Sequence, residues 1–174
     1  MRELVRSILS RKQIDSLRSA RERLSKGWIR FWSLICGVLP DRVVLFVAGN
    51  TQLIKRIDYA HEKILLRIES DVEYETRLHS CTKEPETIDW IHKYFQDGDA
   101  YYDIGANVGA YALVAAKHFR GRVRVYAFEP SFPTFKQLCT NVVLNDCQDS
   151  VTPLQVALSD RTGVAVLNYS SLLP

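Results

Sequence analysis

The segment 103–109 has the residue types of a ligand-binding turn. Its sequence is Asp103-Ile104-Gly105-Ala106-Asn107-Val108-Gly109. Gly105 and Gly109 lack side chains and Ala106 has a small one, so a ligand can approach the backbone closely. The first N–H groups of a following helix would point at that ligand. Asn107 suits either a left-handed backbone position or the helix cap.

The Asp103 carboxylate restricts the charge of the ligand. A dinucleotide site would show G-x-G-x-x-G, but here Asn107 takes the third place and Gly109 falls one place early. A carboxylate repels a pyrophosphate and attracts an ammonium or a sulfonium group. The turn therefore favours a cationic nucleoside with an amino-acid tail, a description that S-adenosylmethionine fits. A nicotinamide-dependent oxidoreductase is the alternative that this charge argument disfavours.

A second acid stands at the distance expected for a ribose ligand. Glu129 follows Gly105 by 24 residues and ends a strand-like run, 122–128. An acid in that place accepts hydrogen bonds from the two hydroxyls of a ribose. An exposed acid at a strand end is the alternative, and the 103–109 pattern upstream favours the ribose role.

The elements around these residues predict an α/β fold. Strands are expected at 100–104, 122–128 and 151–158, and they alternate with helices at 109–119 and from 131 to about 145. Such an order implies right-handed crossovers and a parallel sheet. An extra edge strand is expected at 164–169. This is one half of a Rossmann-like fold, and the ligand normally lies between two halves.

The residues before this half are expected to form accessory structure. Residues 1–60 read as a basic helical segment, since residues 1–30 hold nine Lys or Arg against three Asp or Glu. Residues 61–82 suggest a β-hairpin with strands at 63–68 and 72–78. The third division, 83–174, opens with a helix at 85–95 that begins at a proline.

Four motifs together resemble the FkbM family of methyltransferases. They are the 103–109 segment, Ala127-Phe128-Glu129-Pro130, Asn141-Val142-Val143-Leu144-Asn145, and Ala157-Leu158-Ser159-Asp160 with Gly163. The resemblance covers about residues 83–169. It implies a class I methyltransferase fold and S-adenosylmethionine as the cofactor. It further implies O-methylation of a small-molecule or sugar hydroxyl.

The resemblance also implies roles for matching positions. Asp103, Gly105, Ala106, Asn107 and Gly109 would surround the methionine part of the cofactor, and Glu129 would hold the ribose. Ala157 and Leu158 would lie near the adenine. One departure is Val156, which stands where many class I enzymes carry an Asp that accepts from the adenine amino group.

The catalytic group stays unassigned at this stage. A hydroxyl nucleophile needs a base or a metal to take its proton, and residues that follow a fourth strand often supply it in related folds. The chain ends at Pro174, so we expect a C-terminally truncated methyltransferase domain. The alternative is a non-catalytic remnant that binds S-adenosylmethionine, or nothing, and acts at a membrane or partner.

Composition bounds the partners and the compartment. The chain is 47% hydrophobic and 25% charged, as in soluble globular proteins. Its four cysteines form no C-x-x-C pair and have no histidine at metal-ligand spacing, which favours free thiols, no metal site and a cytoplasmic location. No nucleic-acid partner is expected. Peripheral membrane contact through residues 1–39 is a further expectation. The unpaired edge of strand 100–104 predicts self-association of the chain.

Overall fold

The computed structural model describes residues 26–168, which fall into two compact units that divide between Thr51 and Gln52. In the first unit, residues 26–38 are helical and α3 spans Asp41–Asn50 after Pro40. Within the predicted helical segment 1–60, residues 26–38 and 41–50 are thus helical, and the first 25 residues lie outside the described range. None of the helices between residues 26 and 168 has the length and apolar character needed to cross a membrane.

The second unit begins with two antiparallel strands. β1 (Leu53–Arg56) pairs with β2 (Leu65–Ile68), and Ile54 lies opposite Arg67. The predicted hairpin was therefore wrong in its partners, because its first strand pairs with a segment that we expected to be helical. Its second predicted strand, 72–78, is mostly helix α4 (Asp71–Thr76).

A capping motif explains the helix that replaces that strand. The Ser70 hydroxyl accepts from the Glu73 N–H at 3.2 Å, and the Glu73 carboxylate accepts from the Glu69 N–H at 2.7 Å. Ser70 and Glu73 have the S-x-x-E spacing of a capping box, which starts helices by satisfying free N–H groups. Two short helices follow, α5 (Ser80–Lys83) and α6 (Pro85–Tyr94).

The remaining elements form the predicted half of a Rossmann-like fold. Strand β3 (Ala100–Ile104) leads to α7 (Ala110–His118), β4 (Arg124–Phe128) to α8 (Phe132–Leu144), and the last strand is β5 (Val151–Leu154). The strands are parallel in the order β3-β4-β5, and Asp103 lies beside Ala127. The α/β fold class is confirmed.

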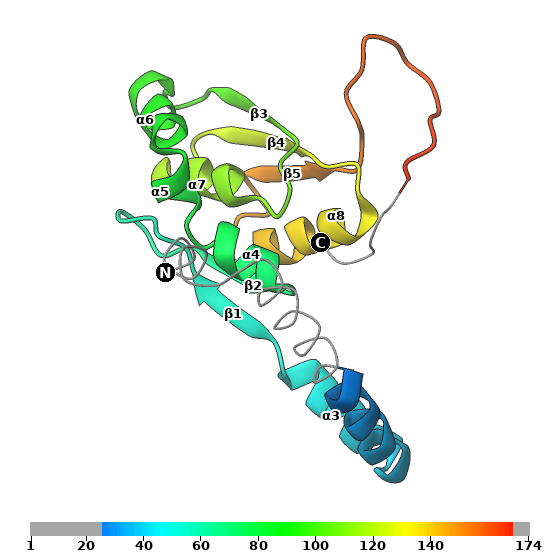
Figure 1. The fold of residues 1–174 in the computed structure, drawn as a ribbon. Coiled ribbons are helices and arrows are strands. Elements are labelled where there is room, and N and C mark those ends of the chain that lie inside the picture. The colour runs from blue at the N-terminus through cyan, green and yellow to red at the C-terminus, as the bar shows by residue number, and fades with distance from the viewer. Residues whose placement is uncertain (1–25, 169–174) are drawn as a thin grey trace, which may run out of the picture. The chain divides into compact units, whose positions relative to one another are not determined.

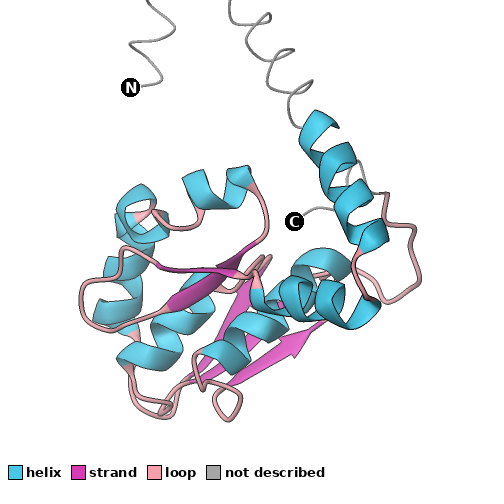
Figure 2. Ribbon diagram, turned by 90° about the horizontal axis from the view of Figure 1, so that it is seen from below, coloured by secondary structure: helices cyan, strands magenta, loops and turns pink. Residues whose placement is uncertain are grey.

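Helices cover one face of this sheet. In Figure 1 α7 and α8 lie below the strands, and in the view from below (Figure 2) the helices lie in front of them. The strand residues on that face, among them Val125, Ala127 and Val151, are buried against helix residues such as Leu113 and Leu138. The small side chains of α7, including Ala112, Ala115 and Ala116, let this helix approach the sheet closely.

The predicted strand at 151–158 is shorter and the one at 164–169 is wrong over its described part. β5 ends at Leu154, and residues 155–168 are an exposed loop. The reason is the lack of a partner. The neighbouring strand β4 ends at Phe128, and the Glu129 N–H donates a hydrogen bond to the Leu154 carbonyl at 3.0 Å. Among the described residues, no strand pairs with the backbone that follows Leu154.

Candidate functional site

The glycine turn lies where β3 ends and is held by the neighbouring strand. The N–H groups of Gly105 and Ala106 both donate to the Phe128 carbonyl at 2.9 Å. Three of its residues have left-handed backbones, with φ of 78° at Gly105, 51° at Asn107 and 88° at Gly109. Glycine and asparagine are the residues that adopt this region most readily. The 103–109 segment thus forms the sharp turn that its composition predicts.

The two glycines of the turn serve different purposes. A Cβ at Gly105 would have no heavy atom within 4 Å, so this side of the turn is open. A Cβ at Gly109 would lie 2.5 Å from the Leu138 side chain. Gly109 therefore lets α8 pack against the start of α7, and the open approach that we expected at both glycines is found at Gly105.

The carboxylate of Glu129 lies against the turn and is 7% exposed. One of its oxygens accepts from the Asn107 N–H at 3.0 Å, and the other accepts from the Ser131 N–H at 2.9 Å. A carboxylate oxygen can accept two hydrogen bonds. Each oxygen therefore keeps acceptor capacity after these bonds, while the two N–H groups fix the orientation of the side chain.

Asp103 is the second buried carboxylate beside the turn. It is 7% exposed, and its Oδ2 has no hydrogen-bond partner in the structure. Burial raises the pKa of Asp103 to about 6, although hydrogen bonds from the Tyr101 side chain and the Ala112 N–H act in the opposite direction. A buried acceptor without a partner is costly, and a cationic ligand would relieve that cost.

The structure brings most of the predicted site residues together. Asp103, Gly105, Ala106, Asn107 and Glu129 meet at the carboxyl ends of β3 and β4. Ala157 and Leu158 lie in the exposed loop that follows β5, and no hydrogen bond links them to the turn. The residues that position Glu129 and Asp103, namely Ser131 and Tyr101, were not predicted. Each contacts a carboxylate two positions away in the sequence, so spacing of two residues was the signal that could have found them.

A cluster of histidines was also missed by the sequence analysis. The Tyr59 hydroxyl lies 2.8 Å from both His92 Nε2 and His118 Nδ1, and the His92 and His118 rings stack at 4.1 Å. His61 packs edge-on against both rings. Burial lowers the pKa values of His92 and His118, so both favour the neutral form. The three histidines are 26 or more positions apart, and no local pattern joins them.

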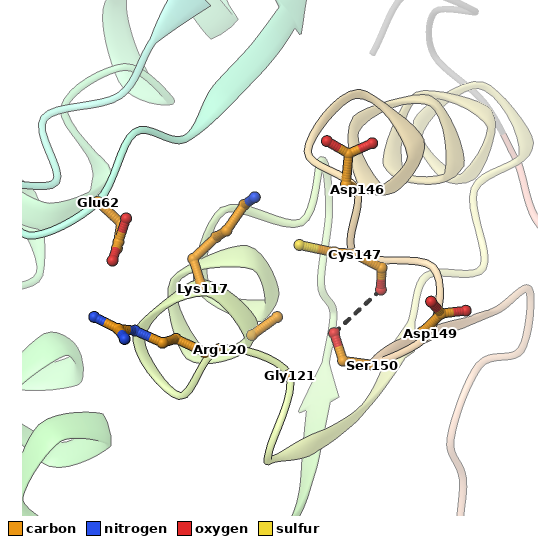
Figure 3. Close-up of a pocket in the computed structure, with 9 residues that line it drawn as sticks. Glu62, Lys117, Arg120, Gly121, Asp146, Cys147, Asp149 and Ser150 are labelled. Carbon is orange, nitrogen blue, oxygen red and sulfur yellow. Dashed lines mark hydrogen bonds between the residues drawn. The ribbon is translucent and has the colours of Figure 1, made fainter.

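A pocket of about 550 Å³ lies at the other end of the sheet (Figure 3). Gly121 and Ser150, which precede β4 and β5, contribute to its wall, so it lies at the amino ends of these strands. Side chains of both charges face it, including Lys117 and Asp149. In residues 26–168 no group of His, Cys, Asp and Glu side chains has the arrangement of a metal site.

Comparison with known proteins finds two methyltransferases that are similar to a 72-residue segment of this chain. The chain is 35% identical over 72 residues to methyltransferase sdnD of Sordaria araneosa, covering 41% of this chain and 27% of that protein. It is 38% identical over 72 residues to the 31-O-demethyl-FK506 methyltransferase FkbM of Streptomyces tacrolimicus, covering 41% and 26%. The chain thus spans about a quarter of the length of these curated relatives. No family model matches it.

Solved structures show a weaker likeness. Trm5 of Methanocaldococcus jannaschii in complex with adenosine has a TM-score of 0.42 at 16% identity, covering 61% of this chain and 30% of that chain. This likeness establishes neither fold nor ligand, so the fold rests on the strand order above and the relationship on sequence. The resemblance predicted from the motifs is confirmed over these 72 residues, where the chain is similar to two curated methyltransferases, one of them FkbM.

Proposed function

We propose that this chain carries the cofactor half of an S-adenosylmethionine-dependent methyltransferase that methylates a hydroxyl oxygen of a small molecule or sugar. The observation that carries the proposal is the pair of buried carboxylates, Asp103 and Glu129, on either side of an open glycine turn. The name of one relative, 31-O-demethyl-FK506 methyltransferase, specifies transfer to an oxygen and supports the acceptor class.

The chain's own residues fit this cofactor. Gly105 leaves space for close approach to the backbone, and the unpartnered Oδ2 of Asp103 suits the ammonium of the methionine part. Glu129 has acceptor capacity for the ribose hydroxyls after its bonds to Asn107 and Ser131. Ala157 and Leu158 would border the adenine. When bound, the cofactor supplies a methyl group that is electrophilic because it is attached to a positive sulfur.

The protein's task is then to align the acceptor oxygen, exclude water and accept the hydroxyl proton. The turn and its two carboxylates hold the cofactor, and the proton acceptor is left unassigned. A non-catalytic remnant is therefore the competing function. The two differ in turnover, because a remnant would bind the cofactor without transferring its methyl group.

Calorimetric titration of the full chain with S-adenosylmethionine tests the binding site. Glu129→Gln replaces one acceptor oxygen by an NH2 group, which cannot accept a hydrogen bond from a backbone N–H or a ribose hydroxyl. Two charge-assisted hydrogen bonds are at stake, so we expect the affinity to fall by roughly ten- to hundredfold. The matched control is Asp149→Asn, which removes an exposed acid at the opposite end of the sheet and should leave affinity unchanged.

Three results would separate the alternatives. Equal affinities of the unmodified chain and Glu129→Gln would overturn the ribose role. Tight binding of NAD instead of S-adenosylmethionine would favour an oxidoreductase. Cofactor binding without methyl transfer to hydroxyl acceptors, measured with labelled methyl groups, would favour the remnant.

The proposal includes a cytoplasmic location and no nucleic-acid partner. Each of the four cysteines, Cys36, Cys81, Cys139 and Cys147, is a free thiol. Free thiols persist in reducing compartments, which supports the cytoplasm.

A further inference from the structure

The first unit carries an apolar surface that nothing among its described residues, 26–51, covers. Helical residues 26–38 and α3 hold no fully buried residue. Apolar side chains are exposed around both segments, at Trp28, Ile29, Phe31, Trp32, Leu34, Val38, Leu39, Val43, Leu45, Phe46 and Val47. Several, such as Leu34 and Leu45, are more than 70% exposed. Contiguous exposed apolar surface of this kind marks an interaction site.

The charges near this surface are few and at its margins. From residue 26 to residue 51 the charged side chains are Lys26, Arg30, Asp41 and Arg42. The runs 31–40 and 43–51 are free of charge. α3 has 10 residues, a length of about 15 Å, or half the hydrocarbon thickness of a bilayer. Segments of this length and character suit the plane of a membrane interface.

The aromatic residues of this apolar surface also favour a membrane interface. Trp28 contacts Phe31 edge-on at 5.7 Å, and Phe31 contacts Trp32 at 6.3 Å, so the three rings form one cluster. The exposed fractions of these rings lie between 51% and 60%. Tryptophan prefers the headgroup region of bilayers, where its ring is partly buried and its N–H stays hydrated.

Charge distinguishes a lipid surface from a second copy of the chain. Residues 1–30 carry nine Lys or Arg against three Asp or Glu, a net charge of +6. Two copies of the chain would each carry this charge, and like charges repel. An anionic bilayer instead attracts them, and this attraction adds to the burial of the apolar side chains.

We propose that the apolar surface of residues 28–47 inserts into the headgroup region of an anionic bilayer, and that the charge of the basic residues in 1–30 strengthens the binding. This interaction goes beyond the proposed methyl transfer and does not rest on it. Cofactor binding and membrane binding therefore succeed or fail in separate measurements.

The test uses the full chain and vesicles of phosphatidylcholine with or without phosphatidylserine. A Trp90→Phe background leaves Trp28 and Trp32 as the two tryptophans, so fluorescence reports on the surface alone. We expect a blue shift and quenching by brominated lipid on vesicles that contain phosphatidylserine. Raising salt from about 0.05 to 0.5 M should weaken binding, because it screens the basic segment.

Variants distinguish insertion through Trp28 and Trp32 from nonspecific adsorption of the protein to vesicles. The double substitution Trp28→Ser and Trp32→Ser should lower the partition coefficient by on the order of tenfold or more, measured by vesicle sedimentation in the native Trp90 chain. Tyr94→Ser is the matched control, because Tyr94 is an exposed ring on α6 in the other unit, and it should have no effect.

Two outcomes would overturn the proposal. The first is sedimentation with the vesicles that is equal for the double variant and the unmodified chain. The second is an assembly of copies that dissociates on the double substitution while the unmodified chain ignores both kinds of vesicle. Equal binding to vesicles with and without phosphatidylserine would overturn the anionic part.

Discussion

Asp103 is a buried carboxylate that the folded protein holds at an energetic cost. Its pKa rises from 3.8 to about 6 because burial disfavours the charged form. The folded state therefore binds the proton more tightly than the unfolded state. Stability from this group is fully present below pH 3.8 and is lost as the pH rises to about 6. At neutral pH the carboxylate destabilises the fold, which is typical of a group retained for binding.

Replacement of Asp103 by Asn should separate stability from ligand binding. We expect a gain of about 1–3 kcal/mol in the free energy of unfolding at pH 7, because the buried charge is removed. The gain should vanish at about pH 3, below the ordinary pKa of 3.8, where Asp103 is protonated in both the folded and the unfolded chain. Urea denaturation at the two pH values checks this. Affinity for S-adenosylmethionine should fall at least about tenfold, and unchanged affinity would exclude Asp103 as a cofactor ligand.

At the scale of single residues, the sequence indicates which side chains could bind a ligand, but it does not predict the contacts that position them. The Asp103 and Glu129 carboxylates and the glycine pattern were evident because turns restrict composition locally. The bond between Glu129 and the Asn107 N–H joins residues 22 positions apart. The clash of a Gly109 Cβ with Leu138 likewise depends on how α7 and α8 pack. Neither contact has a local signature.

Among the elements, α8 has an unusual polar face that acts as a partner for strand β2. Asn145 accepts from the Leu65 N–H at 2.8 Å and donates to the Leu65 carbonyl at 2.7 Å. One turn earlier, Asn141 accepts from the Arg67 N–H at 2.8 Å. Gln137, a further turn back, donates to the Arg67 carbonyl at 2.6 Å. This amide ladder pairs the free edge of β2 as a neighbouring strand would.

Asn141→Ala should therefore destabilise the second unit strongly. Asn141 is fully buried, and its amide also donates to the Val108 carbonyl at 2.9 Å. The change leaves two buried backbone groups without partners, so we expect a loss of about 2–4 kcal/mol in the free energy of unfolding. Chemical denaturation measures it. Val143→Ala, at an exposed position of the same helix, is the control and should cost little. Equal losses would contradict the ladder.

The elements themselves were predictable where periodicity and caps agreed. β3 was predicted at its exact bounds, and α6, α7 and α8 within two residues. The strand predicted at 72–78 was wrong because the prediction relied on the alternation of apolar and polar residues and did not use the Ser70–Glu73 capping motif. β1 was not predicted because its strand conformation depends on pairing with β2, which local sequence does not reveal. The predicted strand at 164–169 lacks a partner over its described part, and strand propensity alone does not form a strand.

In the described part of the second unit, residues 52–168, no helix covers the second face of the sheet. Tyr102, Ile104, Tyr126, Phe128 and Leu154 lie at alternate positions of the three strands, on the face away from the helices. Tyr102 stacks on Tyr126 at 5.3 Å, and Ile104 is 66% exposed. β3 is also at the edge of the described sheet, so its outer backbone groups are unpaired there. The right-handed crossovers predicted from the sequence place both α7 and α8 on the other face.

This bare face and edge predict self-association of the chain. Changing Tyr102 and Ile104 together to Lys should shift the chain toward monomer, because charged residues oppose pairing at a sheet edge. Sedimentation velocity over a concentration series measures the effect, and circular dichroism verifies that the fold is kept. Val143→Lys, an exposed apolar site on α8, is the control. A monomeric unmodified chain at all concentrations would contradict the prediction.

The amide ladder has a consequence for synthesis on the ribosome. Leu65 and Asn145 are 80 residues apart. At roughly 5–20 residues per second, β2 leaves the exit tunnel several seconds before its helical partner exists. During that interval its edge is open to other nascent chains. The ladder can therefore close only after residues 137–145 have been translated.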